Sequence, residues 1–299
     1  MFTLVPPSGQ ESTEWRAALE TPPAAAVEAR EALLARAAQL ADTVNALPQP
    51  PSTWPIDVVI SGCGFLVNYY LGVESILSRC GAVQIHRYAG ASSGAKAPVH
   101  LLLAGEATTL DHHLAYGAFC TQRGGSKLHA ACRNDRCARV TFDYLLEHHE
   151  RELPRLDDKV HICVAQHTWR GPRRVVLSRY CDDSLHVIRQ RMREFFHATG
   201  TLLTRVEGYG WCSDGAMAGN APLFEGPDCQ RDQLLCQPQR SGLPSSMVFA
   251  YSLEEAVLAV RKGQDDAVAL LQREFSGAQQ EPRHAAAGAG ALSVVRRPV

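Results

Sequence analysis

The chain has 299 residues, 45% of them hydrophobic and 20% charged, which is enough for one large α/β domain or two small ones. Its formal net charge of -1 gives no reason to expect a nucleic-acid partner. It contains no apolar run of about 18 residues, so the sequence predicts no membrane-spanning helix.

The N-terminus and the cysteines favour a cytoplasmic protein. The N-terminus lacks the basic and apolar regions of a secretory signal, and five glutamates between residues 11 and 31 make it too acidic for a transit peptide. None of the ten cysteines belongs to a C-x-x-C pair, and their spacings are uncommon for zinc. We therefore expect free thiols in a reducing compartment rather than disulfides or a metal site.

Residues 1–50 form an N-terminal extension in this interpretation. Residues 1–23 are expected to be irregular, and a helix over 24–47 should begin with Thr21 as its N-cap and Pro22 at the first helical position. The helix has one apolar stripe, formed by Leu33, Ala37, Leu40, Val44 and Leu47. We expect the stripe to pack on the main domain, since it is short for a coiled coil.

The main domain spans residues 51–276, and its first half alternates strands with turns and helices. Short apolar runs bounded by turn residues indicate buried strands, and apolar residues three and four apart indicate helices. The expected elements are a strand at 56–60, a loop at 61–64, a helix at 66–77, a strand at 84–89, a turn at 90–94 and a helix at 95–104. This alternation predicts a mainly parallel sheet with helices on its faces.

The second half is less regular. The expected elements are helices over most of 107–155 with a break at Gly124 and Gly125, strands at 160–165 and 175–178, a helix at 184–198, a glycine-rich loop at 208–210 and a helix at 253–275. The tail, 277–299, is rich in alanine, glycine and arginine, and we expect it to be disordered.

A G-x-S-x-G motif spans residues 90–94, between an expected strand and an expected helix. In a nucleophile elbow the flanking glycines, here Gly90 and Gly94, allow a sharp turn that exposes the serine hydroxyl. The N-terminus of the following helix then stabilises negative charge beside that hydroxyl. The motif is common in ordinary turns, but its position between strand and helix makes Ser92 a candidate nucleophile.

The loop at Gly62, Cys63 and Gly64 also lies between an expected strand and helix. Consecutive main-chain N–H groups in such a loop form an anion-binding nest, which in a hydrolase holds the oxyanion of the tetrahedral intermediate. A dinucleotide fingerprint is the rival interpretation. It fits poorly, because Val67 stands at the third glycine position and no acidic residue ends the next strand.

Asp214 begins an Asp-Gly-Ala run that also fits an ordinary turn. Beside an exposed serine, Asp214 is also a candidate general base, because a serine needs a base to act as a nucleophile at neutral pH. The histidines fit that role poorly: His112 and His113 lie on a polar helical stretch, and His161 and His167 bracket an expected strand.

Taken together, the runs at 62–66 (Gly-Cys-Gly-Phe-Leu), 90–94 and 214–222 resemble the patatin-like phospholipases. The first run and the Tyr-Tyr-Leu-Gly-Val that follows at 69–73 are similar to the adipose triglyceride lipase and adiponutrin branch. The resemblance covers roughly 56–224 and, more loosely, the helix near 253–272.

This resemblance implies a three-layer α/β/α sandwich of the patatin type with a mainly parallel central sheet. It also implies that the catalytic residues are Ser92 and Asp214. The implied oxyanion hole is formed by Gly62, Cys63 and Gly64. The implied motif-supporting residues are Gly90, Gly94, Gly215 and Asn220. The Ser–Asp dyad would act without a histidine, a metal or an organic cofactor.

The implied activity is hydrolysis of lipid carboxylic esters through an acyl-enzyme, at a transient membrane or lipid-droplet surface and with no nucleic acid. The implied location is cytoplasmic or peripheral at such surfaces. The alternative is a catalytically weak or inactive patatin-like domain that binds a lipid or a protein. Val67, in place of the third glycine of the first motif, is the main support for that alternative.

Overall fold

The structure is a computed structural model, and it describes residues 9–48, 50, 52–123, 127–178, 185–198, 203–225, 229–248, 251–276 and 290–297. The helices are α1 (Gly9–Glu20), α2 (Ala24–Asn45), α3 (Val67–Leu77), α4 (Ser93–Arg123), α5 (Lys127–His148), α6 (Leu185–Ala198) and α7 (Leu253–Phe275). The strands are β1 (Trp54–Ile60), β2 (Val83–Ala91), β3 (Val160–Thr168), β4 (Gly171–Leu177), β5 (Thr204–Val206), β6 (Gly210–Asp214), β7 (Asp232–Cys236) and β8 (Leu292–Val295). Short 3₁₀ turns include η1 (Gly64–Leu66), η2 (Glu150–Leu156) and η3 (Gly215–Ala218).

One mixed sheet organises the described part of the chain. Its strands follow the order β5-β6-β3-β2-β1-β7-β8, and β4 pairs with β3. The central strands β3, β2, β1 and β7 run parallel, whereas the pairs toward both edges are antiparallel. The predicted α/β class with a parallel sheet centre is therefore confirmed.

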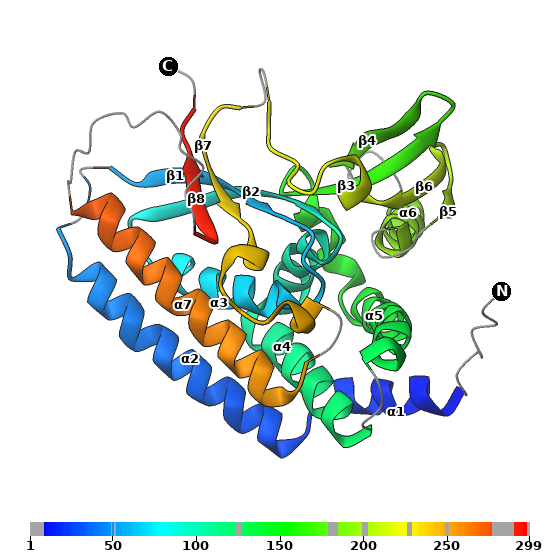
Figure 1. The fold of residues 1–299 in the computed structure, drawn as a ribbon, viewed down its shortest axis with the longest axis horizontal. Helices are drawn as coiled ribbons and strands as arrows, with labels where there is room; N and C mark the ends of the chain where they lie inside the picture. The colour runs from blue at the N-terminus through cyan, green and yellow to red at the C-terminus, as the bar shows by residue number, and fades with distance from the viewer. Residues whose placement is uncertain are drawn as a thin grey trace.

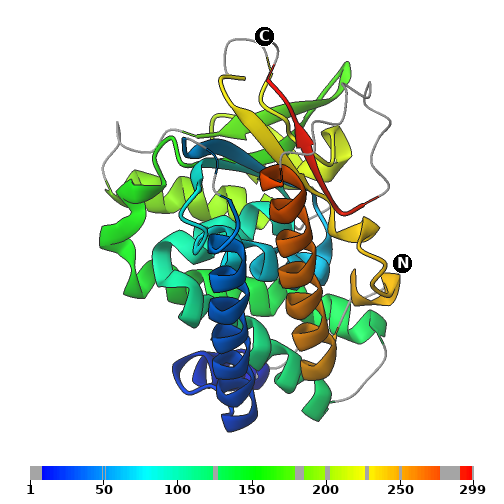
Figure 2. The ribbon, with the colours of Figure 1, turned by 90° about the vertical axis from the view of Figure 1, so that its left-hand side faces the viewer.

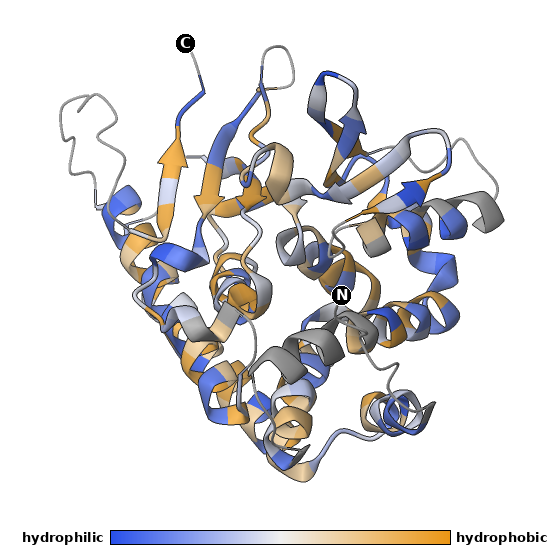
Figure 3. Ribbon diagram, turned by 45° about the vertical axis from the view of Figure 1, so that its right-hand side comes forward, coloured by the Kyte–Doolittle hydropathy of each residue, from blue (hydrophilic) through white to orange (hydrophobic). Residues whose placement is uncertain are grey.

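Helices α2, α3, α4 and α7 lie on one side of the sheet (Figures 1 and 2). Alternate residues of a strand face opposite sides, so Ile56, Val58 and Ile60 of β1 enter the large core beneath these helices. Helices α3 and α7 approach most closely, because glycines at their crossing leave no side chain between the backbones. Figure 3 shows apolar and polar residues side by side on the helices, as expected for helices that bury one face.

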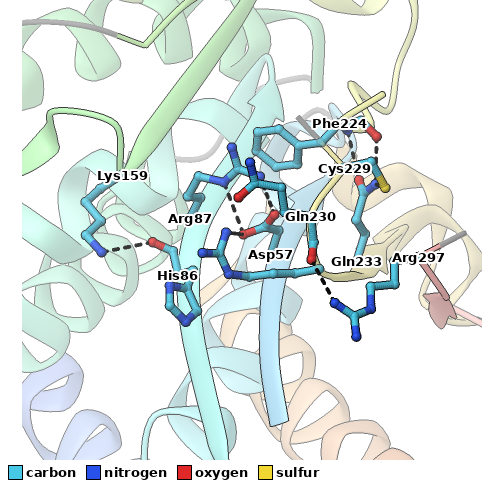
Figure 4. A network of polar contacts seen from close by, with 10 residues as sticks. Asp57, His86, Arg87, Lys159, Phe224, Cys229, Gln230, Gln233 and Arg297 are labelled. Atoms are coloured by element: carbon cyan, nitrogen blue, oxygen red, sulfur yellow. Dashed lines mark hydrogen bonds and ion pairs between the residues drawn. The ribbon is translucent and has the colours of Figure 1, made fainter. Parts of the chain in front are cut away.

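The opposite face of the sheet has a smaller apolar cluster, in which Phe224 covers Val59 and Ala89. A polar network lies beside it (Figure 4). The Arg87 guanidinium donates two hydrogen bonds, of 3.2 and 2.5 Å, to the Asp57 carboxylate, which is fully buried. Pairing of a buried carboxylate with an arginine fork is what makes its burial tolerable.

The N-terminal extension is part of the main core. Helix α2 begins at Ala24 as predicted and ends at Asn45, but its N-cap is Pro23 rather than Thr21. Residues 9–20 were expected to be irregular, but they form α1, whose Trp15 and Leu19 join the same hydrophobic core as α3 and α7. The first turn of α1 offered no sequence signal as strong as the alanine-rich composition of α2.

The C-terminal tail corrects a second expectation. Residues 292–295 form the edge strand β8, which pairs antiparallel with β7, so disorder was a wrong prediction for residues 290–297. The remaining tail residues, 277–289 and 298–299, lie outside the described residues. The strand is only four residues long, and the alanine-, glycine- and arginine-rich composition around it is typical of disorder, so no clear strand pattern is visible in the sequence.

Two further predictions are confirmed. The helix expected over 95–104 ends at Gly105, whose φ of 80° is not helical, and α4 resumes as a second helix beyond this kink. The expected glycine-rich loop at 208–210 is the turn of a hairpin between β5 and β6. The predicted break at Gly124 and Gly125 lies outside the described residues.

Candidate active site

Ser92 occupies a sharp turn between β2, which ends at Ala91, and α4, which begins at Ser93. Its φ of 55° lies in the left-handed region, which a non-glycine residue adopts only at an energetic cost. Such a strained strand-to-helix turn is the geometry of a nucleophile elbow. The structure thus gives Ser92 the backbone conformation that the motif requires.

The two motif glycines are sterically necessary. A Cβ on Gly90 would lie 2.2 Å from the Gly94 carbonyl oxygen, and one on Gly94 would lie 2.5 Å from the Ile60 carbonyl oxygen. Real Cβ atoms do not approach backbone so closely. Glycine at both positions lets α4 start directly against β1 and β2.

Asp214 reaches this turn because of the register of the sheet. Along β3, Cys163 pairs with Ala91 at the end of β2, and the next residue, Val164, pairs with Asp214 at the end of β6. The strand end that precedes Ser92 and the strand end that holds Asp214 therefore meet on neighbouring residues of β3. Gly215 confirms the proximity, since a Cβ there would lie 3.3 Å from the Ala91 Cβ.

Ser92 and Asp214 line the same cavity, and both side chains are partly exposed. The Asp214 carboxylate accepts a hydrogen bond of 2.9 Å from the Ala216 N–H and so caps η3. Among the described residues no hydrogen bond joins the Ser92 hydroxyl to that carboxylate. Catalytic hydrogen bonds are often long before substrate binds. The arrangement therefore places Ser92 and Asp214 in one cavity without a hydrogen bond between their side chains.

The loop at 62–64 lies against the elbow, but its N–H groups differ in their partners. The Gly62 N–H donates to the Asn220 carbonyl at 3.2 Å, and the Cys63 N–H donates to the Ser93 hydroxyl at 3.3 Å. The Gly64 N–H makes no hydrogen bond within the described part of the chain, and Gly64 lines the cavity. Gly64 is therefore the best placed of the three expected oxyanion donors.

The first residue of α4 supplies a further donor. Ser93 follows the candidate nucleophile and lines the cavity, and the described residues provide no acceptor for its N–H. The first N–H groups of a helix have no partner within the helix and point toward incoming negative charge. Sequence reasoning passed over Ser93, although the general geometry of nucleophile elbows assigns an oxyanion donor to the residue after the serine.

The neighbouring thiol is not a rival nucleophile. Cys63 is buried, and this burial raises the pKa of its thiol to about 12. A neutral thiol is a poor nucleophile, because the thiolate is the reactive form.

The cavity has a volume of about 250 Å³. Aromatic rings form a continuous part of its wall: Phe65 stacks on Tyr116 at 4.9 Å between ring centroids, and Tyr116 meets Trp15 edge-on at 5.4 Å. Tyr251 packs against Phe65 at 4.8 Å. The site thus combines polar groups, among them Ser92 and Lys96, with an aromatic part of the wall.

Three histidines line the same cavity, whereas the sequence placed His112 and His113 on a polar helical stretch. The rings of His100 and His112 are joined by a 2.9 Å hydrogen bond. Burial lowers the pKa of His100 well below its ordinary value and lowers the pKa values of His112 and His113 to about 4. The three rings are therefore neutral near pH 7, and among the described residues none bonds to Ser92.

The structure therefore brings together Ser92, Asp214 and the 62–64 loop, with Gly90, Gly94, Gly215 and Asn220 around them. Sequence reasoning missed Ser93, Trp15 and the cavity-facing histidines. In the described part of the chain no three His, Cys, Asp or Glu side chains gather as a metal site. None of the helices described there is long and apolar enough to cross a membrane.

The fold and the site together define an α/β protein with a strained serine opposite an aspartate. No protein-family model matches the chain, and no curated protein matches it.

Proposed function

We propose that this protein is a serine acyl hydrolase that cleaves carboxylic esters of lipids, with Ser92 as nucleophile and Asp214 as base. The observation that supports this most is the meeting of the two strand ends: Ala91 and Asp214 pair with consecutive residues of β3, next to a serine at φ 55°. The mostly parallel sheet is compatible with a three-layer sandwich, and the patatin type of that sandwich is part of this proposal.

The reaction follows from the positions of these groups. Asp214 accepts the proton of the Ser92 hydroxyl while the oxygen attacks the ester carbonyl carbon. The N–H groups of Gly64 and Ser93 stabilise the oxyanion of the tetrahedral intermediate, an interaction that typically contributes about 10²–10³ in rate for each donor. The carbon–oxygen bond to the alcohol then breaks, and the alcohol leaves with the proton from Asp214.

The second half of the reaction regenerates the enzyme. A water molecule gives a proton to Asp214 and attacks the acyl carbon bound to Ser92. The bond to the serine oxygen breaks, the free acid leaves, and Ser92 recovers its proton. General-base assistance of this kind is worth typically about 10²–10⁴ in rate.

A lipid substrate would place the protein transiently at a membrane or lipid-droplet surface, in the cytoplasm or peripheral to these surfaces. The aromatic interior of the cavity supports an apolar acyl group, because such walls gain free energy when they exclude water from an apolar ligand.

A second candidate function is a domain that binds an apolar ligand with weak or no catalysis. Val67, at the start of α3, is buried and lines the cavity, where a glycine would leave more room. The Cys63 N–H, already bonded to Ser93, also reduces the number of free oxyanion donors.

Hydrolysis of short-chain and medium-chain p-nitrophenyl esters by the wild type, Ser92→Ala and Asp214→Asn distinguishes the two functions. The proposal expects turnover by the wild type and its loss in both variants, with unchanged circular dichroism spectra. Retained turnover in either folded variant would refute the dyad. Absence of wild-type turnover together with saturable binding of fatty acid would favour the second function.

A further inference from the structure

The N-terminal extension contributes a side chain to the cavity that contains Ser92. Trp15 of α1 is 1% exposed and lines this cavity. Helix α1 packs against α4 and α5 (Figure 1). A segment that precedes all the catalytic motifs in the sequence therefore forms part of the candidate substrate site.

The Trp15 indole is held in one orientation. Its Nε1–H donates to the Cys137 carbonyl and to the Thr141 hydroxyl, both on α5, with nitrogen–oxygen distances of 3.0 Å. The ring also meets Tyr116 edge-on and packs at a tilt against Phe119, with centroids 5.6 Å apart. A side chain fixed by both hydrogen bonds and ring contacts is a rigid wall rather than a mobile one.

Two aromatic rings separate Trp15 from the oxyanion loop: Trp15 meets Tyr116, and Tyr116 stacks on Phe65, which follows Gly64. On α4, His100 is eight residues beyond Ser92 and before the kink at Gly105, which corresponds to about 12 Å along the helix axis. His100 bonds to His112, which follows the kink. Tyr116, one helical turn beyond His112 on α4, meets Trp15 edge-on.

The cavity size sets the length of a chain that fits between Ser92 and Trp15. An apolar cavity of about 150 Å³ holds a six-carbon benzene ring, so 250 Å³ corresponds to about ten carbons. The neutral histidines present no charge to such a chain at pH 7.

We propose that Trp15 closes the far end of the cavity and limits the acyl group to medium length, so that the preferred substrates are esters of about ten-carbon acids. This inference rests on the proposed hydrolase function. It adds a specificity-determining residue that belongs to the N-terminal extension and not to the catalytic motifs.

The test compares kcat/KM for butanoyl, decanoyl and hexadecanoyl p-nitrophenyl esters. The wild type should prefer the decanoyl ester. Trp15→Ala should raise kcat/KM for the hexadecanoyl ester by at least about tenfold relative to the butanoyl ester, since each methylene accepted by an apolar pocket is worth about tenfold or more. Trp15→Phe, which keeps an aromatic ring and is less disruptive to α1, should shift the preference in the same direction by less.

Leu19→Ala is the matched control. Leu19 is on the same helix and is 3% exposed, but its side chain does not line the cavity, so its truncation loosens α1 without lengthening the cavity. An unchanged chain-length profile in folded Trp15→Phe and Trp15→Ala would overturn the inference. The same shift in Leu19→Ala would also overturn it, because loosening of α1 would then be the cause.

A binding measurement separates this inference from the hydrolase function. Calorimetric titration of Ser92→Ala with decanoate and hexadecanoate should show tighter binding of decanoate, and adding Trp15→Ala should reverse the order. If no variant hydrolyses esters but this reversal occurs, the hydrolase function fails and the chain-length limit stands. If esters are hydrolysed but neither binding nor kcat/KM depends on residue 15, the function stands and this inference fails.

Discussion

Gly62→Ala offers the most specific perturbation of the candidate site. The backbone of Gly62 is not in the left-handed region, so alanine is permitted by its dihedral angles. The added methyl group, however, would lie 2.9 Å from the Ser92 Cβ and 2.8 Å from the Asn220 side-chain oxygen. The exposed Asn220 can turn aside, whereas the elbow holds Ser92 between β2 and α4.

The size of the effect follows from that contact. Carbon atoms pack at about 3.5–4.0 Å, so Ser92 must move by about 0.6–1 Å. A displacement of about 1 Å at a reacting group costs about 10² in rate, or about 2.7 kcal/mol in activation free energy. The free energy of unfolding should fall by only about 1–3 kcal/mol, which is typical of overpacking.

The assay is ester hydrolysis at saturating and limiting substrate, with urea unfolding on the same preparations. Gly81→Ala is the control, because a Cβ there would have no neighbour within 4 Å. It should leave both kcat/KM and stability close to wild type. A folded Gly62→Ala with unchanged kcat/KM would show that Ser92 is not the reacting group or that its position is not critical.

Three further predictions concern the scaffold. Gly263→Ala places a Cβ 1.9 Å from the Tyr69 carbonyl at the α3–α7 crossing and should lower the urea-derived unfolding free energy by about 3 kcal/mol, whereas full stability would contradict this close approach. Arg87→Met leaves the buried Asp57 carboxylate with Arg231, 3.9 Å away, as its remaining ion-pair partner among the described residues. The substitution should lower the urea-derived unfolding free energy by about 3 kcal/mol. A decrease below about 1 kcal/mol would show that the Arg87–Asp57 pair is dispensable for stability. Burial lowers the pKa of His112 in the folded protein to about 4. As the pH falls, the unfolded chain therefore binds a proton at this histidine near pH 6.5, whereas the folded protein binds it only near pH 4. Stability should therefore fall as the pH drops through this window, and His112→Gln should flatten that part of the profile; an identical slope in the variant would count against a buried neutral ring.

The residues of the candidate catalytic centre could be named from the sequence because their signals are local. Gly90 and Gly94 belong to one five-residue motif, and a short strand before a G-x-S-x-G run leaves few alternatives for Ser92, although the contact that requires glycine at 94 is with the Ile60 carbonyl of β1. The parallel strands at the centre of the sheet were predictable for the same reason, since buried strands read as continuous apolar runs.

The rest of the site depends on contacts that are distant in sequence. Trp15 meets Cys137 and Thr141 through the packing of α1 on α5, and no periodic pattern in α1 signals this partner. His112 is polar but buried, in the half of α4 beyond the Gly105 kink, whose Tyr116 and Phe119 contact Trp15 of α1. Strand β8 is ordered by its pairing with β7, a long-range contact that overrides a composition typical of disorder.

The most direct test of the central claim is the mapping of a fluorophosphonate adduct by mass spectrometry after incubation with the native protein. We predict one modified residue, Ser92, with labelling lost in Ser92→Ala and much slower in Asp214→Asn. Stable modification of another residue, or undiminished labelling when Asp214 is replaced, would contradict the assignment of a serine nucleophile activated by this aspartate.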